Sequence, residues 1–175
     1  MVKGKTMEPT GKPKLERIAY HEAGHAVTMH YFGNEIDELS IKPNINRLAG
    51  VKPKKGNTKS PNINPDEIAE GIKGCVIGFL GGLAAEHIYN GEPNKMNPIG
   101  STEDLKRAKG FCRAFKLKLS YQDLIDWLLN DALELLKENW EAVEALSAAL
   151  IQKGTISGEE AAKIIEVNID KSVEK

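Results

Sequence analysis

Two histidines and a glutamate form the part of the chain whose spacing points most directly to chemistry. Residues 21–25 read H-E-A-G-H, an H-E-x-x-H motif. On a helix, His21 and His25 lie one turn apart on the same face, so their imidazoles can bind one metal ion. Glu22 lies beside that face, where its carboxylate can accept a proton from a zinc-bound water with a pKa of about 7. The motif therefore predicts a zinc site with a general base next to it.

Coincidence is the alternative interpretation of this motif. With average usage of His and Glu, an H-E-x-x-H pattern arises by chance in ~0.5% of chains of this length. Here two of the four histidines of the chain occupy the motif, and the motif falls within an amphipathic segment. A core helix without a metal would favour apolar residues at His21 and His25, because buried imidazoles need polar partners. We therefore favour a metal site.

A catalytic zinc ion usually has three protein ligands and one water, so a third ligand must come from elsewhere in the chain. Asp104 follows Ser101 by three residues, a spacing that also suits a helix-capping pair. Spacing alone leaves ligand and cap equally probable for Asp104. Glu86 can be a ligand, an acceptor for an imidazole N–H, or a plain helix-end residue. The residues considered as third ligand are Glu86, His87, Asp104 and, less plausibly, Glu103 and His30.

The elements that must position these residues can be predicted from periodicity and from turn and cap residues. Apolar residues at helical spacing and a Gly33-Asn34 stop predict a helix that carries the motif. β-branched, alternating residues predict a small hairpin or sheet near residues 36–51. Four lysines within 52–60 suit a solvated loop better than a contact for an acidic partner. The expected helices cover 13–32, 64–90, 103–117, 121–139, 140–153 and a final segment that starts with a capping pattern at 157–160, and the expected strands cover 36–41 and 48–51.

The second of these helices is unusually rich in glycine. Each glycine costs up to ~1 kcal/mol of helix propensity relative to alanine. Such a cost usually means that another part of the backbone approaches closely, so we expect this helix to pack tightly within the molecule. The glycines concerned lie close to one face: Gly71, Gly74, Gly78 and Gly82.

Length and composition limit the classes of function. With 175 residues, 41% hydrophobic and 28% charged, the chain suits one globular domain over residues 14–167, with a flexible arm at 1–13 and a tail at 168–175. A net charge of -1 gives no global attraction to nucleic acid or to membranes, and the longest uncharged stretch, 74–85, is shorter than the ~18 residues of a membrane span. Two cysteines and a polar N-terminus favour a reducing, cytoplasmic location. No phosphate-binding loop of a nucleotide-driven motor is present.

Taken together, several segments resemble successive parts of the peptidase domain of FtsH-type ATP-dependent zinc proteases. The resemblance covers about residues 15–166 and includes both order and spacing. Its motifs are A-Y-H-E-A-G-H-A-V at 19–27, L-S-I-K-P at 39–43, G-G-L-A-A-E at 81–86, S-T-E-D-L at 101–105 and the segment 150–160. The ordered set is much more specific than the H-E-x-x-H motif alone.

The resemblance implies roles for individual residues. It implies that His21, His25 and Asp104 bind one zinc ion per chain and that Glu22 is the catalytic base. It also implies that Glu86 supports the site without binding the metal and that a strand after the zinc helix aligns the substrate. For that substrate edge we expect Leu48, Ala49, Gly50 and Val51.

The resemblance implies that the chain is a zinc metalloendopeptidase. It also implies an α+β, predominantly helical fold, in which the motif helix packs on the glycine-rich helix and a helical bundle follows. Members of that family carry a membrane anchor and an ATPase module that are not seen here. We therefore expect the chain to act on peptides or unfolded segments, or to act together with a separate unfoldase or regulatory partner. The sequence does not decide whether the chain forms a homo-oligomer. Other departures from the family pattern are His87, the loop 52–60 and a short segment at 111–122. The alternatives are a non-proteolytic binding or regulatory module and a zinc hydrolase of small molecules.

Overall fold

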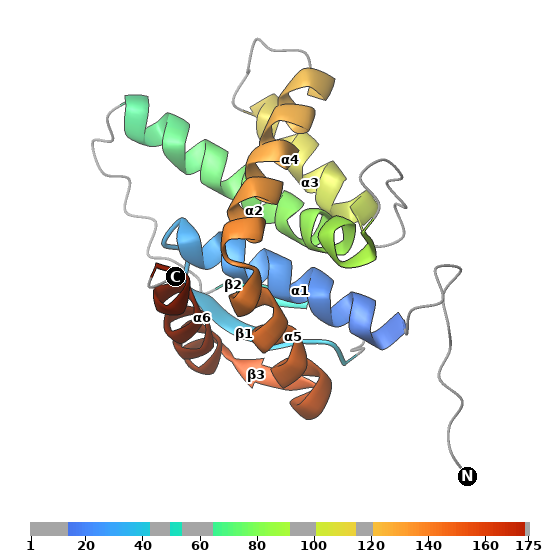
Figure 1. Cartoon of the computed structure of the whole chain (residues 1–175). Helices are drawn as coiled ribbons and strands as arrows, with labels where there is room; N and C mark the ends of the chain where they lie inside the picture. Colours follow the sequence, from blue (N-terminus) through green and yellow to red (C-terminus); the bar gives the residue numbers. More distant parts are fainter. Residues whose placement is uncertain (1–13, 43–49, 54–64, 92–100, 115–120, 174–175) are drawn as a thin grey trace.

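The computed structural model describes residues 14–42, 50–53, 65–91, 101–114 and 121–173, and the statements that follow concern these residues. The described fold is α+β and mostly helical, as predicted (Figure 1). The expected arm 1–13, the loop residues 54–60 and the strand residues Leu48 and Ala49 lie outside the described residues. The elements are α1 (Lys14–Tyr31), β1 (Ile36–Ser40), β2 (Gly50–Pro53), α2 (Pro65–Asn90), α3 (Ser101–Ala114), α4 (Tyr121–Glu138), α5 (Trp140–Lys153), β3 (Thr155–Ser157) and α6 (Gly158–Val173).

The predicted helix ends have a clear local cause. Gly33 and Gly91 follow α1 and α2 with φ of 71° and 67°, a left-handed conformation in which glycine carries no steric penalty. The Glu160 N–H at the start of α6 donates to Ser157 Oγ at 3.2 Å, as its capping pattern predicts. The sequence pattern predicts that α3 starts at residue 103, but Ser101 already belongs to the helix. Asp104 therefore lies in the first turn of α3.

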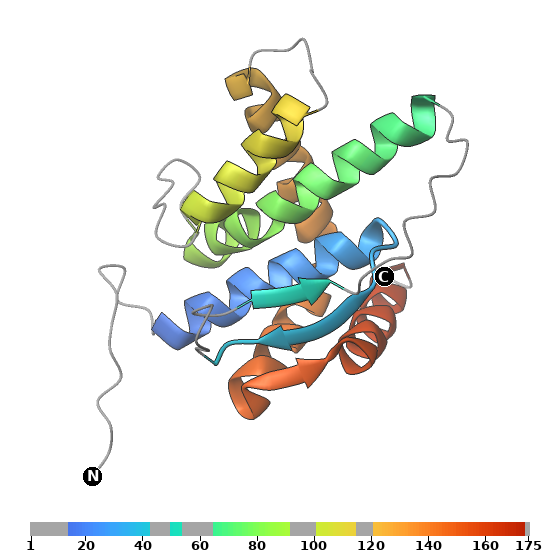
Figure 2. The ribbon, with the colours of Figure 1, turned by 180° about the vertical axis from the view of Figure 1, so that it is seen from behind.

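A three-stranded antiparallel sheet lies beside α1, with the order β2-β1-β3 (Figure 2). Leu39 in the central strand is opposite Val51 in β2 and Ile156 in β3. The sheet near residues 36–51 was predicted, but β3 was not. Three residues are too short to show strand alternation, and β3 depends on its pairing with β1.

Helix α1 is the central element of the core. Every residue of α1 from Ala19 to Thr28 is buried except Tyr20, which is partly buried. Helix α2 packs along one side of α1, and α5 packs along another side. The H-E-x-x-H motif therefore lies on a helix that is fixed by neighbours on several sides.

The contact between α1 and α2 is a close approach of two backbones. A Cβ added at Gly24 would clash with the carbonyl oxygen of Gly81 and would lie 2.5 Å from the Ala85 Cβ. A Cβ added at Gly81 would lie 2.6 Å from the carbonyl oxygen of Gly24 and would clash with Thr28 Oγ1. Real Cβ contacts are longer than this, so both glycines are required at the crossing. The helix turns that carry the motif histidines thus lie directly against α2.

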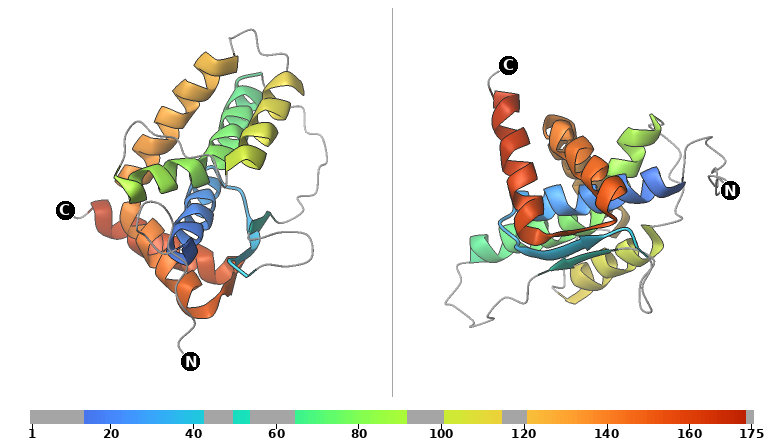
Figure 3. Two further views of the ribbon diagram at one scale, coloured as in Figure 1. Left: turned by 90° about the vertical axis from the view of Figure 1, so that its right-hand side faces the viewer. Right: turned by 90° about the horizontal axis from the view of Figure 1, so that it is seen from below.

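Helix α2 changes direction along its length, so that its second half runs across α1 at a different angle from its first half (Figure 3, left). Glycines and a side chain inserted into the helical hydrogen-bond ladder are common causes of such bends. Both are present between Gly78 and Gly82.

Within the described residues, no helix combines the length and apolar character needed to cross a membrane.

Candidate metal centre

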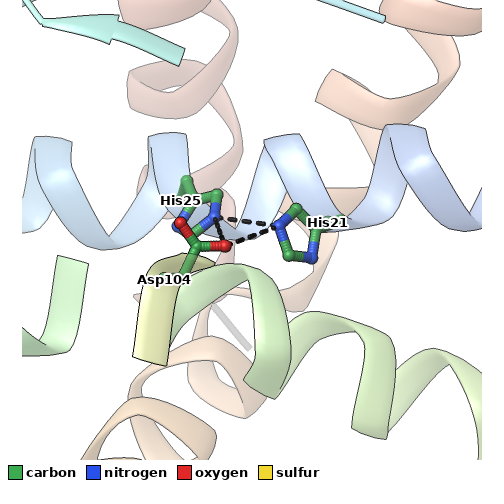
Figure 4. A group of neighbouring side chains, drawn as sticks. All are labelled: His21, His25 and Asp104. Atoms are coloured by element: carbon green, nitrogen blue, oxygen red, sulfur yellow. Dashed lines mark hydrogen bonds and ion pairs between the residues drawn. The ribbon is translucent and has the colours of Figure 1, made fainter. Parts of the chain in front are cut away.

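Three side chains from two helices converge at the first turn of α3. His21 and His25 come from α1, and Asp104 comes from α3 (Figure 4). The two Nε2 atoms are 3.0 Å apart, and Asp104 Oδ2 lies 3.3 Å from the Nε2 of His21 and 3.4 Å from that of His25. All three side chains are largely buried. The structure therefore brings together the three residues that the resemblance implies as ligands.

The distances among these three atoms suit a tetrahedral zinc site. With bonds of about 2.0–2.1 Å, two ligand atoms of a tetrahedral zinc ion lie about 3.3 Å apart. The three sides of the triangle measure 3.0, 3.3 and 3.4 Å. Two imidazoles and one carboxylate also form a typical donor set for a catalytic zinc, with the fourth position left for water. The residues present therefore fit a zinc ion.

The other ring nitrogen of His25 is held by the backbone of α2. His25 Nδ1 lies 2.8 Å from the carbonyl oxygen of Gly78 and 3.3 Å from the amide nitrogen of Gly82. With its proton on Nδ1, the ring donates to the Gly78 carbonyl and presents the lone pair of Nε2 to Asp104 and His21. Metal-binding histidines usually have such an acceptor for the second ring nitrogen.

The other ring nitrogen of His21 lies beside a carboxylate. His21 Nδ1 lies 2.7 Å from Glu86 Oε1, and Arg17 Nη1 lies 3.7 Å from Glu86 Oε2. All three residues are less than a tenth exposed. Glu86 therefore lies behind His21, on the side away from Asp104, and Arg17 balances its charge. Arg17 was not singled out from the sequence, although its spacing of four residues before His21 places it on the same face of α1.

Charges around the site act strongly on His21 and Asp104. Burial lowers the pKa of His21, but hydrogen bonds with Asp104 and Glu86 and the negative charge of Glu22 outweigh it and raise that pKa to about 10. Burial favours the neutral form of Asp104, yet hydrogen bonds with His21 and His25 hold its pKa well below the usual range. The site is therefore rich in negative charge and selects for a cation, either a proton or a metal ion.

The general base expected from the motif is also placed nearby. Glu22 is 6% exposed, and its charge contributes to the raised pKa of His21. Glu22 directly follows His21 on α1, and the motif predicts its carboxylate beside an ion held by the two histidines.

Other predicted candidates lie apart from the triangle. The Glu103 side chain is 65% exposed, and Lys106 Nζ and Arg107 Nε lie within 3.8 and 3.9 Å of its carboxylate. His30 and His87 are partly buried and do not belong to the three-residue cluster of the described part of the chain. For the substrate edge, Gly50 and Val51 lie in β2, one of the two outer strands of the sheet.

The glycine at position 82 faces the candidate ligands. A Cβ added at Gly82 would lie 2.5 Å from His25 Nε2 and 2.7 Å from His21 Nε2. The sequence suggested Gly82 only as part of a packing face. Its spacing of four residues from both Gly78 and Glu86 was the available signal, because all three then lie on the face that meets the histidines.

Comparison with known proteins finds similar sequences that share a description. The chain is 25% identical over 85% of its length to the "ATP-dependent zinc metalloprotease FtsH" of Mycoplasmopsis synoviae (strain 53), and it covers 28% of that protein. It is 26% identical over 85% of its length to the protein of the same description in Mycoplasma mobile, of which it covers 26%. It is 25% identical over 90% of its length to the "ATP-dependent zinc metalloprotease FtsH 2" of Petrotoga mobilis, of which it covers 31%.

The chain thus spans a quarter to a third of the length of these curated relatives. No protein-family model matches it.

Proposed function

We propose, from the distant relationship of this chain to the FtsH metalloproteases, that it is a zinc metalloendopeptidase that cleaves peptides or unfolded protein segments. One observation carries the proposal. The triangle of His21 Nε2, His25 Nε2 and Asp104 Oδ2 has sides close to those of a tetrahedral zinc site, and Glu22 is its buried neighbour. A module that only binds zinc has no physical need for a carboxylate at this position.

His21, His25 and Asp104 would hold the zinc ion, which would polarise the carbonyl of the scissile peptide bond and lower the pKa of a bound water. Glu22 would accept a proton from water as the water oxygen bonds to the carbonyl carbon, and would pass that proton to the amine nitrogen released when the C–N bond breaks. Glu86 keeps the proton of His21 on Nδ1, so that Nε2 is available to the metal, and the Gly78 carbonyl does the same for His25. Arg17 holds the Glu86 carboxylate in place.

For the substrate we propose an extended peptide along β2. This strand is one of the two outer strands of the sheet, and it contacts α1, the helix with the motif histidines. An extended chain that pairs with a sheet edge is held by main-chain hydrogen bonds, which suits cleavage with little dependence on sequence. We extend the proposed edge to Leu48 and Ala49, which precede the described part of β2. Because a folded protein cannot present such a strand, we expect unfolded chains as substrates unless a separate unfoldase delivers them.

The test compares the full chain loaded with Zn²⁺ with Glu22→Gln, using fluorescently labelled casein as an unfolded substrate. The matched control is Glu134→Gln, the same change at an exposed position of α4. We expect Glu22→Gln to keep one zinc ion per chain by elemental analysis and to lose casein cleavage by a factor of about 10²–10⁴, the usual contribution of a general base. The control should cleave at the parental rate.

Two results would contradict the proposal. Cleavage by Glu22→Gln at the rate of the parent would exclude Glu22 as the base. A parent that binds zinc but leaves casein and short peptides intact, with and without chelator, would favour the alternative of a non-proteolytic binding or regulatory module.

A further inference from the structure

Helix α2 provides three successive supports for the two imidazoles. The Gly78 carbonyl oxygen lies 2.8 Å from His25 Nδ1, and Glu86 Oε1 lies 2.7 Å from His21 Nδ1. Gly82 lies between them, four residues from each, and therefore on the same face of the helix. The outer two positions hold the ring nitrogens that face away from Asp104. Gly82, at the middle position, has no side chain and contacts the rings in a different way.

Gly82 is adjacent to the ring nitrogens that face Asp104. An added Cβ would have ring atoms as its three nearest neighbours: His25 Nε2 at 2.5 Å, His21 Cε1 at 2.6 Å and His21 Nε2 at 2.7 Å. Each distance is below 3.0 Å, which real Cβ contacts essentially never show. The same atoms, His21 Nε2 and His25 Nε2, form one side of the donor triangle.

The rings have little freedom to move away from such a Cβ. Both histidines are less than a tenth exposed, and each Nδ1 has a partner on α2. The backbones of α1 and α2 are already in contact at Gly24 and Gly81, one residue before Gly82. A side chain at position 82 must therefore displace at least one imidazole and break the triangle.

We infer that Gly82 determines whether this site can bind an ion, because its missing side chain leaves open the space at the two Nε2 atoms. Gly82 is thus a positioning residue: it does not bind the metal but permits the two imidazoles to do so. The inference rests on the proposed function for the identity of the ion. It goes beyond that function by assigning metal binding to a position that has no donor side chain.

The test measures Zn²⁺ affinity of Gly82→Ala by competition with a chromophoric chelator, starting from metal-free protein. The control is Gly110→Ala, the same change in α3, where an added Cβ would meet no atom of the described residues within 4 Å. An altered partner behind a metal-binding histidine typically costs 10–100-fold in affinity, and displacement of the ring itself should cost more, so we expect a loss of at least about 100-fold. The control should bind Zn²⁺ as the parent does.

A second measurement distinguishes a blocked site from a misfolded protein. In the presence of EDTA, Gly82→Ala should lower the urea midpoint of the parent. In a His21→Ala, His25→Ala background, which removes the rings, the same change should raise the midpoint, because alanine is the better helix former. Failure of both expectations would show that the rings do not define the space at position 82.

The outcomes separate this inference from the proposed function. Loss of Zn²⁺ by Gly82→Ala with retention by the control supports the inference. Parental Zn²⁺ affinity in Gly82→Ala overturns it and leaves the proposed function intact. A parent chain that does not bind Zn²⁺ overturns both.

Discussion

Removal of the metal should make the stability of this protein depend steeply on alkaline pH. Without a metal, the cation that fills the site is the proton of His21, whose pKa is about 10 in the folded protein against an ordinary value of 6.5. A raised pKa in the folded state contributes stability that is complete below pH 6.5 and is lost as the pH rises toward 10. The metal-free protein should therefore lose stability between these two values.

The size of the effect follows from the shift. Each pH unit within this window removes up to about 1.4 kcal/mol, so three units from pH 6.5 to pH 9.5 remove at most roughly 4 kcal/mol. Since domains unfold with about 5–15 kcal/mol, this loss would be a large part of the total. Asp104 acts in the opposite direction: its lowered pKa contributes stability that is lost as the pH falls below its ordinary value of 3.8.

The assay is urea unfolding followed by circular dichroism in EDTA, at half-unit steps from pH 6.5 to pH 9.5. The parent should show a falling midpoint with an unchanged urea dependence of the unfolding free energy. His21→Gln removes the titrating group and should give a nearly flat profile. A flat profile in the parent, or the same slope in His21→Gln, would refute the reasoning that His21 carries the proton of the metal-free site.

Three further predictions concern single substitutions. Asp104→Ala should bind much less zinc by elemental analysis, whereas loss of a helix cap alone would cost about 1 kcal/mol and leave the zinc content unchanged. Glu86→Gln should weaken Zn²⁺ binding by about 10–100-fold in a chelator competition, and it should lower the urea midpoint less than Glu86→Ala does. Parental Zn²⁺ affinity in Glu86→Gln would show that the contact with His21 Nδ1 has no positioning role. Gly24→Ala should lower the melting temperature, because its Cβ meets the Gly81 carbonyl. Gly110→Ala should instead raise the free energy of unfolding by about 0.5–1 kcal/mol. Equal effects of the two substitutions would contradict the close approach of α1 and α2.

The helices were predictable because their signals are local. Apolar spacing and the stop at Gly33 predict α1 within one residue at each end, and the Asn90-Gly91 stop predicts the end of α2. Strand β3 has no such signal, since it forms only through the pairing of Ile156 with Leu39. Local sequence patterns predict single helices and strands, but they do not predict which distant segments pair with each other.

The candidate site shows the same division. His21, Glu22 and His25 are adjacent on one helix, so their spacing alone predicts a shared face. Asp104 comes from another helix, and spacing left it between ligand and cap until the resemblance favoured the ligand. For Arg17 and Gly82, spacing indicates the helix face, but it does not identify the residues on other helices that they contact.

The order of strands in the sheet has a consequence for how the protein forms. The central strand β1 pairs with β3, although Ser40 and Thr155 are 115 residues apart in sequence. Contacts of such long sequence separation slow folding, because loop closure costs entropy before the contact forms. During synthesis on the ribosome, β1 cannot acquire its second partner until residue 157 has emerged. The sheet beside α1 is therefore completed only after residues 155–157 have been synthesised, and a chain truncated before Thr155 should remain open along that edge of β1.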